Sequence, residues 1–160
     1  MTPRRLSATA PELPATLDLL RRAFACMEGR IDPPSSLTRM DLTALTHEAA
    51  QKELWILPGV GSPAACMILT PQVDALYIGK LAVAEKARGQ GLARQLLDLA
   101  DSRARALGLP RLRLQTRVEL TENHATFTAL GFAETARTSH PGYDRPTSLT
   151  YERPVQEHSR

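Results

Sequence analysis

The spacing of hydrophobic positions divides this chain into helical and extended segments. Apolar residues form a stripe near a period of 3.6 over residues 11–27, which predicts a helix, and a second helix is expected from residue 38 or 41 to about 51. Short apolar or alternating runs between turn residues predict strands. The expected strands cover residues 3–8, 53–57, 64–69, 75–83, 111–116, 132–139 and 148–153.

The helix expected over residues 92–107 has the clearest pattern. Its apolar positions share one side, and Asp101 and Arg105 are spaced to form an ion pair one turn apart. Gly108 suits a left-handed C-terminal cap, and Pro110 blocks further helix. The order of elements, strands first and then strands alternating with helices, predicts a mixed α/β layered fold.

Length and composition are those of an ordinary globular protein. The 160 residues predict a single domain over residues 1–153, with 154–160 expected as a disordered tail. The net charge is only +3, although the pI is near 9.2, because basic and acidic residues are mixed. This balance argues against a nucleic-acid-binding module, which only the pI suggests.

The sequence also indicates a compartment. No apolar stretch follows Arg4 and Arg5 as in a secretory signal, and none approaches the roughly 20 residues of a membrane span. Cys26 and Cys66 both lie in apolar contexts and are expected to be reduced core thiols, with a disulfide between them as the less favoured alternative. We therefore expect a cytoplasmic protein.

Residues 88–93, Arg-Gly-Gln-Gly-Leu-Ala, carry the most specific chemistry in the chain. They join an apolar strand to the start of a helix. Glycines let the backbone approach an anion there, and the free N–H groups of the first helical turn, the helix dipole and Arg88 all favour negative charge. The segment predicts a site for a phosphorylated cofactor, the alternative being a glycine-rich turn without a ligand.

Two common phosphate loops do not fit this segment. A Walker A loop requires Gly-Lys followed by Ser or Thr, which is absent, and a dinucleotide fingerprint needs glycine where Arg94 stands. The pattern Arg88-x-x-Gly91-x-Ala93 instead resembles the acyl-CoA pyrophosphate loop of the GNAT superfamily, the acyl-CoA-dependent N-acetyltransferases. The preceding strand that ends at Val83 and the segment 121–132, which ends in Gly-Phe, fit the same family.

The resemblance implies the GNAT fold, a twisted, mixed, mostly antiparallel sheet flanked by helices. It places a short helix within residues 121–132. It also makes residues 75–83 and 111–116 two central parallel strands that splay apart to admit acyl-CoA. The match is strong over residues 76–132 and weak before them. Dimers are common in this fold, so a homodimer stays open, although no predicted helix requires a partner.

The resemblance further assigns acetyl-CoA as co-substrate, with no metal. The backbone at Leu81, Ala82 and Val83 would pair with the pantetheine arm, and one N–H there would face the thioester carbonyl. Asn123 matches a family asparagine that contacts the CoA arm, although it equally suits a helix N-cap. The pyrophosphate would lie on Arg88, Gly89, Gln90, Gly91, Leu92 and Ala93.

Proton transfer is where the sequence departs from the family. Many members carry a Tyr five residues before the last Phe of the Gly-Phe pair, where this chain has Phe127, which has no proton to give. Phe127 is still expected to border the cofactor. Some relatives use a Glu on the strand before the loop, where this chain has Tyr77. The catalytic candidates are Glu119, Tyr77 and His124, with Asp74, Glu122 and His140 as further titratable groups and Tyr143 as a substitute acid.

Lys80 is unusual because it falls inside an otherwise apolar strand, where a lysine must reach solvent or an acid such as Glu48. Together with Arg117, Tyr143 and Arg145 it forms the predicted substrate-binding set, which suits an acidic substrate. The predicted function is transfer of acetyl from acetyl-CoA to a primary amine of a small molecule or protein, by direct attack in a ternary complex. A catalytically impaired acyl-CoA-binding protein of the same fold is the alternative, and a nucleic-acid-binding module is a remote one.

Overall fold

A computed structural model describes residues 2–157, apart from the side chain of Thr38. Helices and strands follow one another in the predicted order, and the helix over 92–107 has the predicted ends. Two short 3-10 turns, η1 (Ser36–Arg39) and η2 (Glu85–Ala87), were not predicted. The elements are β1 (Arg4–Leu6), α1 (Leu13–Ala25), α2 (Leu42–Gln51), β2 (Glu53–Leu57), β3 (Ala65–Pro71), β4 (Leu76–Val83), α3 (Leu92–Leu107), β5 (Arg111–Arg117), α4 (Thr121–Ala129), β6 (Ala133–Thr138) and β7 (Ser148–Pro154).

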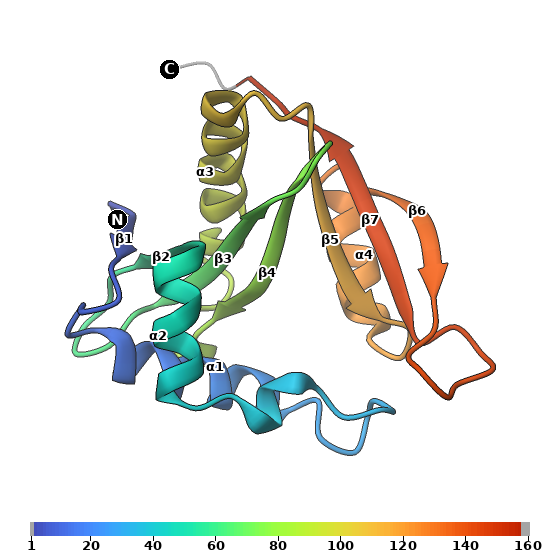
Figure 1. The fold of residues 1–160 in the computed structure, drawn as a ribbon, viewed down its shortest axis with the longest axis horizontal. Coiled ribbons are helices and arrows are strands. Elements are labelled where there is room, and N and C mark those ends of the chain that lie inside the picture. Colours follow the sequence, from blue (N-terminus) through green and yellow to red (C-terminus); the bar gives the residue numbers. More distant parts are fainter. Residues whose placement is uncertain (1, 158–160) are drawn as a thin grey trace.

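The described strands form one seven-stranded sheet in the order β1-β2-β3-β4-β5-β7-β6. Neighbouring strands are antiparallel, except for the central pair β4 and β5, which are parallel. Figure 1 shows β4 and β5 close together where both begin and far apart where both end. The predicted layered fold, a mostly antiparallel sheet with two splayed central parallel strands, is confirmed.

Helices cover both faces of the sheet, and each face has its own core (Figure 1). On one face, α1 and α2 bury leucines such as Leu20 and Leu45 against β1, β2 and β3. On the other face, α3 buries Leu96 and Leu97 against β3, β4 and β5. The apolar stripes of α1 and α3 therefore face the sheet, as hydrophobic burial requires.

A β-bulge in β4 lies at the point where the central strands part. Gly79 pairs with Ile68 of β3 and Ala82 pairs with Cys66, so two residues of β4, Lys80 and Leu81, lie opposite one residue of β3. Lys80 has φ of 51°, in the left-handed region that a lysine rarely adopts. A bulge bends and twists its strand. The parallel pairing of β4 with β5 accordingly ends just before it, at Ile78.

A buried ion pair ties α3 to β7. Asp101 is fully buried, and its two carboxylate oxygens each accept a hydrogen bond of 3.1 Å from the guanidinium of Arg153. Arg105, which the helical spacing pairs with Asp101, instead donates to the Ser102 hydroxyl and to the backbone carbonyl of Gln156. The predicted pairing within α3 is thus replaced by one that links two distant elements.

The end of the chain and the cysteines complete the fold. Residues 154–157 belong to the predicted tail, but Pro154 continues β7, and the Gln156 N–H donates to Asp101 at 3.1 Å. Residues 158–160 lie outside the described residues. Both cysteines are free; Cys66 is buried as expected, whereas Cys26 is exposed, so its placement in the core was wrong. Within residues 2–157 no helix is long and apolar enough to cross a membrane.

Replacing Asp101 with Ala should reduce the free energy of unfolding by about 3–5 kcal/mol, because it leaves the Arg153 charge buried without a partner. Chemical denaturation with urea measures this difference. Asp18→Ala is the matched control: Asp18 also pairs with an arginine, Arg22, but on the exposed side of α1. That change should cost about 0.5 kcal/mol or less, and equal losses for the two variants would contradict the structural role given to Asp101.

Candidate functional site

A cavity of about 350 Å³ opens where β4 and β5 part. Residues 77–81 of β4 form one wall and residues 114–117 of β5 form the opposite wall. Because the strands separate, the cavity passes between the two faces of the sheet. The α1 side contributes apolar side chains from α1 and the segment after it, and the other side contributes residues of α4. The apolar lining of the α1 side is Phe24, Met27, Ile31 and Leu37.

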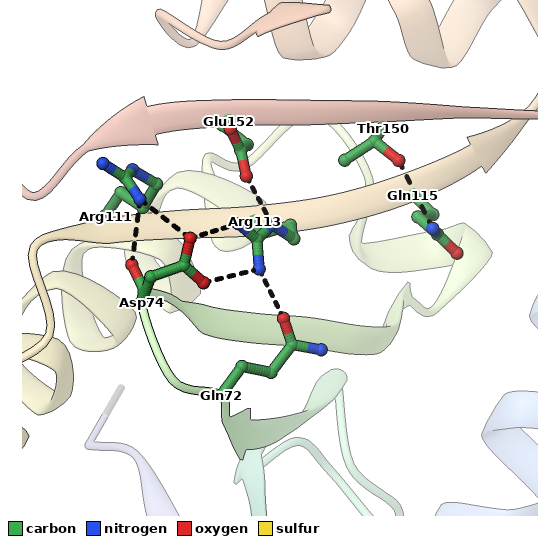
Figure 2. Close-up of polar contacts among 7 residues, drawn as sticks. All are labelled: Gln72, Asp74, Arg111, Arg113, Gln115, Thr150 and Glu152. Atoms are coloured by element: carbon green, nitrogen blue, oxygen red, sulfur yellow. Dashed lines mark hydrogen bonds and ion pairs between the residues drawn. The ribbon is translucent and has the colours of Figure 1, made fainter. Parts of the chain in front are cut away.

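A polar clamp holds the closed end of the splayed pair (Figure 2). Asp74, just before β4, accepts hydrogen bonds of 3.1 Å from Arg111 and from Arg113 of β5. Arg113 also donates to Gln72 at 2.6 Å and forms an ion pair with Glu152 of β7. The Arg113 guanidinium is the main cause that lowers the pKa of the Asp74 carboxyl. These contacts fix the start of β4 against β5, so the separation of the strands begins beyond them.

Residues 30–34, which follow α1, contact β5, α4 and the loop before β7 across the α1 side of the cavity. We call them the bridging segment. Its contacts are polar: Arg30 pairs with Glu122 of α4 at 2.7 Å, and the Tyr143 hydroxyl donates to Asp32 at 2.6 Å. Arg117 of β5 donates to the backbone carbonyls of Pro33 and Pro34, at 2.5 and 3.2 Å. The segment therefore borders the cavity while it spans the gap between the strands.

Three residues predicted to form the site hold the bridging segment instead. Glu119 accepts a hydrogen bond of 3.2 Å from the backbone N–H of Asp32. Arg145 pairs with the Asp32 carboxylate at 3.4 Å and lies over the ring of Tyr143. Neither Glu119, Tyr143 nor Arg145 is among the residues that line the cavity. Tyr143, Arg145 and one carboxylate oxygen of Glu119 thus hold the segment, a structural role that the sequence pattern does not reveal. The other oxygen of Glu119, Oε1, is buried without a hydrogen-bond partner among the described residues.

The predicted catalytic residue His124 also lies apart from the cavity lining. Its Nε2 donates to the backbone carbonyl of Arg117 at 2.9 Å, and its ring stacks on Tyr151 with 6.0 Å between centroids. Since a carbonyl only accepts hydrogen bonds, this contact fixes the proton on Nε2. The ring is therefore placed to join α4 to the sheet.

Two candidates for proton transfer, Tyr77 and His140, line the cavity on its α1 side. Burial raises the pKa of the Tyr77 phenol, so it stays protonated at neutral pH and donates rather than accepts a proton. Burial, and secondarily the charge of Arg117, lowers the pKa of His140 below 6.5, so its imidazole is neutral at pH 7. Its Nδ1 is hydrogen-bonded to the Thr147 hydroxyl. The sequence identified His140 only as one of several titratable residues, and its place in the lining of the same cavity as Tyr77 comes from the tertiary fold.

Lys80 enters the same side of the cavity from the bulge of β4. Its ammonium donates to the Ser36 hydroxyl at 3.3 Å. Burial is the main cause that lowers the pKa of Lys80, and Glu48 partly opposes the shift. Glu48 itself pairs with Lys52 at 2.9 Å, one turn along α2. Lys80 therefore contacts a hydroxyl rather than the predicted acid, and Glu48 acts on it only from a distance while it pairs with Lys52.

On the opposite side of the cavity, α4 presents Asn123 and Phe127. Asn123 is the third residue of α4 rather than its N-cap, which is Leu120, so the N-cap alternative was wrong. Its side-chain amide donates to Thr116 of β5 at 3.3 Å. Phe127 packs against the rings of Phe132 and Tyr151. Both side chains therefore form a wall beside β5.

The loop over residues 88–93 follows the end of β4 through η2 and leads into α3. Gly89 and Gly91 have φ of 79° and 75°, and a side chain at either would point into open space. The first backbone bond of α3 runs from the Gln95 N–H to the Gly91 carbonyl. The N–H groups of Leu92, Ala93 and Arg94 precede that bond and have no partner within the helix. Residues 88–91 are exposed, and the loop follows the end of β4, where the strands are far apart, so it suits a large anion.

Comparisons with known proteins bear on this arrangement. The sequence matches the model of the acetyltransferase (GNAT) family over residues 14–132, and no functionally curated protein matches it. One similar solved structure is the ribosomal-protein-S18-alanine N-acetyltransferase from Escherichia coli, with 22% identity, 99% of this chain and 96% of that chain covered, and a TM-score of 0.71.

Two further solved structures are similar over nearly their whole length. A GNAT family acetyltransferase from Elizabethkingia anophelis with acetyl-CoA bound is 22% identical, with 96% and 97% of the two chains covered and a TM-score of 0.66. Aminoglycoside 6'-acetyltransferase type Ii is 12% identical, with 99% and 100% covered and a TM-score of 0.77. At such identities the likeness shows a shared fold.

Acid should weaken the clamp that holds the site. The pKa of Asp74 is lowered in the folded protein from an ordinary value of 3.8, so its contribution to stability is present above that pH and is lost as pH falls through the lower value. The urea midpoint of the wild type should therefore drop as the pH falls below about 4. In Asp74→Asn this part of the drop should be missing, and identical pH profiles for the two proteins would contradict the clamp.

Proposed function

Because the chain belongs to the acetyltransferase (GNAT) family, we propose that it is an N-acetyltransferase, which transfers acetyl from acetyl-CoA to a primary amine by direct attack in a ternary complex. The observation that carries this proposal is the cavity between the splayed strands, which is lined by residues from both faces of the sheet. Donor and acceptor can then meet between β4 and β5 from opposite sides. A structural neighbour with acetyl-CoA bound supports the choice of donor.

The donor side consists of the loop over 88–93, the bulged end of β4 and α4. The loop offers backbone N–H groups, open space at its glycines and the Arg88 charge to the CoA pyrophosphate. Leu81 lines the cavity beyond the last residue of β4 that pairs with β5, so its backbone is free of that ladder. The pantetheine arm extends along this edge, through Ala82 and Val83, with Asn123 and Phe127 on the opposite wall.

Backbone N–H groups at the bulge polarise the thioester carbonyl. The bulge turns Lys80 and Leu81 away from regular pairing at the place where the acyl group would lie. A preorganised N–H donor aimed at a developing oxyanion typically contributes a few kcal/mol to lowering the barrier. The strained backbone at Lys80 would then serve catalysis, because it orients the N–H groups of the bulge.

His140 accepts the proton of the attacking amine, directly or through water. It lines the acceptor side, is neutral at pH 7 and is held by Thr147, whereas Glu119 and His124 are used elsewhere. Tyr77, which is protonated and lies in the same cavity, can donate to the departing thiolate in place of the tyrosine that Phe127 replaces. General acid–base catalysis of this kind contributes about 10²-fold to 10⁴-fold.

We also propose the cytoplasm as the compartment, a proposal supported by the two free cysteines. The rival function is an acyl-CoA-binding protein of the same fold without catalysis. It is suggested by Phe127, which stands where many family members have the tyrosine that donates a proton. Release of CoA from acetyl-CoA in the presence of an amine panel separates the two. Turnover supports the enzyme, and acetyl-CoA binding without any turnover supports the rival.

Gly91→Glu should abolish binding of CoA and acetyl-CoA, because it places a negative charge in the anion loop at a position with φ of 75°. Calorimetric titration measures the affinity. Gly61→Glu is a matched control, since Gly61 has φ of 77°, equally open surroundings and a place in the distant β2–β3 turn. Both variants carry the same backbone strain, so equal losses of affinity would remove the loop from the site.

His140→Gln should lower kcat about 10²-fold at neutral pH and remove the acid limb of the kcat/KM profile. The base works in its neutral form, so wild-type kcat/KM falls as the pH drops through the lowered pKa of His140, below 6.5. His47→Gln, on the exposed side of α2, is the control and should keep both the rate and the profile. An unchanged acid limb in His140→Gln would exclude His140 as the base.

A further inference from the structure

The charged groups that line the cavity are unbalanced. Among the described lining residues, Lys52, Lys80 and Arg117 carry positive charge, and Glu48 alone carries negative charge. All four lie with Tyr77 and His140 on the α1 side, which is the acceptor side of the proposed enzyme. The excess of positive charge therefore belongs to the part of the cavity that receives the amine.

Internal contacts do not neutralise this excess. Glu48 pairs with Lys52, so one negative and one positive charge are matched. No described carboxylate lies within 4 Å of the charged atoms of Lys80 or Arg117; Lys80 donates to a hydroxyl and Arg117 to two backbone carbonyls. Burial is the main cause that lowers the pKa of both side chains. The charges of Glu48 near Lys80, and of Glu119 and Asp32 near Arg117, partly oppose the shift, so carboxylates lie nearby but none is in contact with either cation.

An anion bound in the cavity could form the ion pair that Lys80 and Arg117 do not have within the protein. A half-buried ammonium is stabilised most by a charge-assisted hydrogen bond to a carboxylate or phosphate oxygen. A second cationic group would meet repulsion in the same place. The amine that attacks the thioester is deprotonated and therefore uncharged, so it cannot pair with the Lys80 ammonium. A separate anionic group on the acceptor would be needed for that ion pair.

We propose that the acceptor is a primary amine that also carries an anionic group, a carboxylate or a phosphate, which Lys80 binds while an apolar part packs on the α1 side. The apolar surface for that part is supplied by Phe24, Met27, Ile31 and Leu37. This inference rests on the proposed acetyltransferase function and narrows its substrate class. It separates this chain from its structural neighbour that acetylates aminoglycosides, which are polycationic amines.

Calorimetric binding to the CoA-loaded protein tests the proposal without turnover. The ligands form matched pairs that differ in the anionic group: L-phenylalanine with L-phenylalaninamide, and O-phosphoethanolamine with ethanolamine. At least one anionic member should bind about tenfold or more tightly than its neutral partner, the size expected for one hydrogen bond to a charged group. The pair with the larger ratio tells carboxylate from phosphate.

Lys80→Gln should bring that ratio close to one, and Lys80→Arg should keep it because the charge is retained. Arg22→Gln removes an exposed positive charge on α1 and serves as the control, with the ratio unchanged. Retention of the preference in Lys80→Gln would overturn the role of Lys80. If the Gln variant does not fold, Lys80→Arg still tests the proposal, because loss of the preference in spite of the retained charge would contradict it.

The same titrations distinguish failure of this inference from failure of the proposed function. If CoA binds but the two members of each pair bind equally, or kanamycin binds more tightly than all four ligands, the inference is wrong and the acetyltransferase proposal stands. If CoA does not bind, the proposed function fails. The matched pairs titrated into the protein alone then still decide whether the cavity prefers anionic amines.

Discussion

The divergence of two parallel strands, β4 and β5, is the constraint on which the rest of the structure depends. Their pairing extends only from Leu76 to Ile78 of β4. At one end the Asp74 clamp fixes the strands to each other, and at the other the bulge at Lys80 turns β4 away. The clamp thus favours pairing where the strands begin, and the bulge accompanies the end of that pairing, so the cavity opens beyond Ile78. The bridging segment then spans the open end on the α1 side through polar contacts.

This geometry divides the cavity between two kinds of chemistry. Beside one side, outside the cavity lining, lies a glycine loop that leads into α3, and β4 beyond Ile78 is not paired with β5; these features suit a long phosphorylated donor. The other side has a neutral imidazole, a protonated phenol and unmatched cations beside apolar walls, which suit an amine with an anionic group. The two sides meet only where the strands part. A sheet closed along its full length would keep the same side chains on separate faces.

Local patterns in the sequence predicted those features that residues close in sequence determine, such as helix ends and turns. The helix over 92–107 has the expected ends because Gly91 and Gly108, both at positive φ, bound its apolar stripe. Contacts between distant segments were not predictable: Asp101 finds Arg153 rather than Arg105, and Glu119, Tyr143 and Arg145 hold a segment from the other half of the chain. Lys80 was recognised as unusual in its strand, but a bulge is specified by pairing with β3, which the residues of β4 alone do not reveal. The site predictions were therefore most specific for the loop, whose geometry is local, and least specific for the proton-transfer groups, which the fold brings together.

Hydrogen exchange of the backbone amides, measured with and without saturating acetyl-CoA, tests the central claim that the donor lies between the splayed strands. The account predicts slower exchange in two separate segments, the bulged end of β4 over residues 79–83 and the loop with the first turn of α3 over 89–94. Exchange in β1 and β2, far from the cavity, should not change beyond the general effect of stabilisation. Unchanged exchange in both segments, or protection confined to another part of the sheet, would contradict the account.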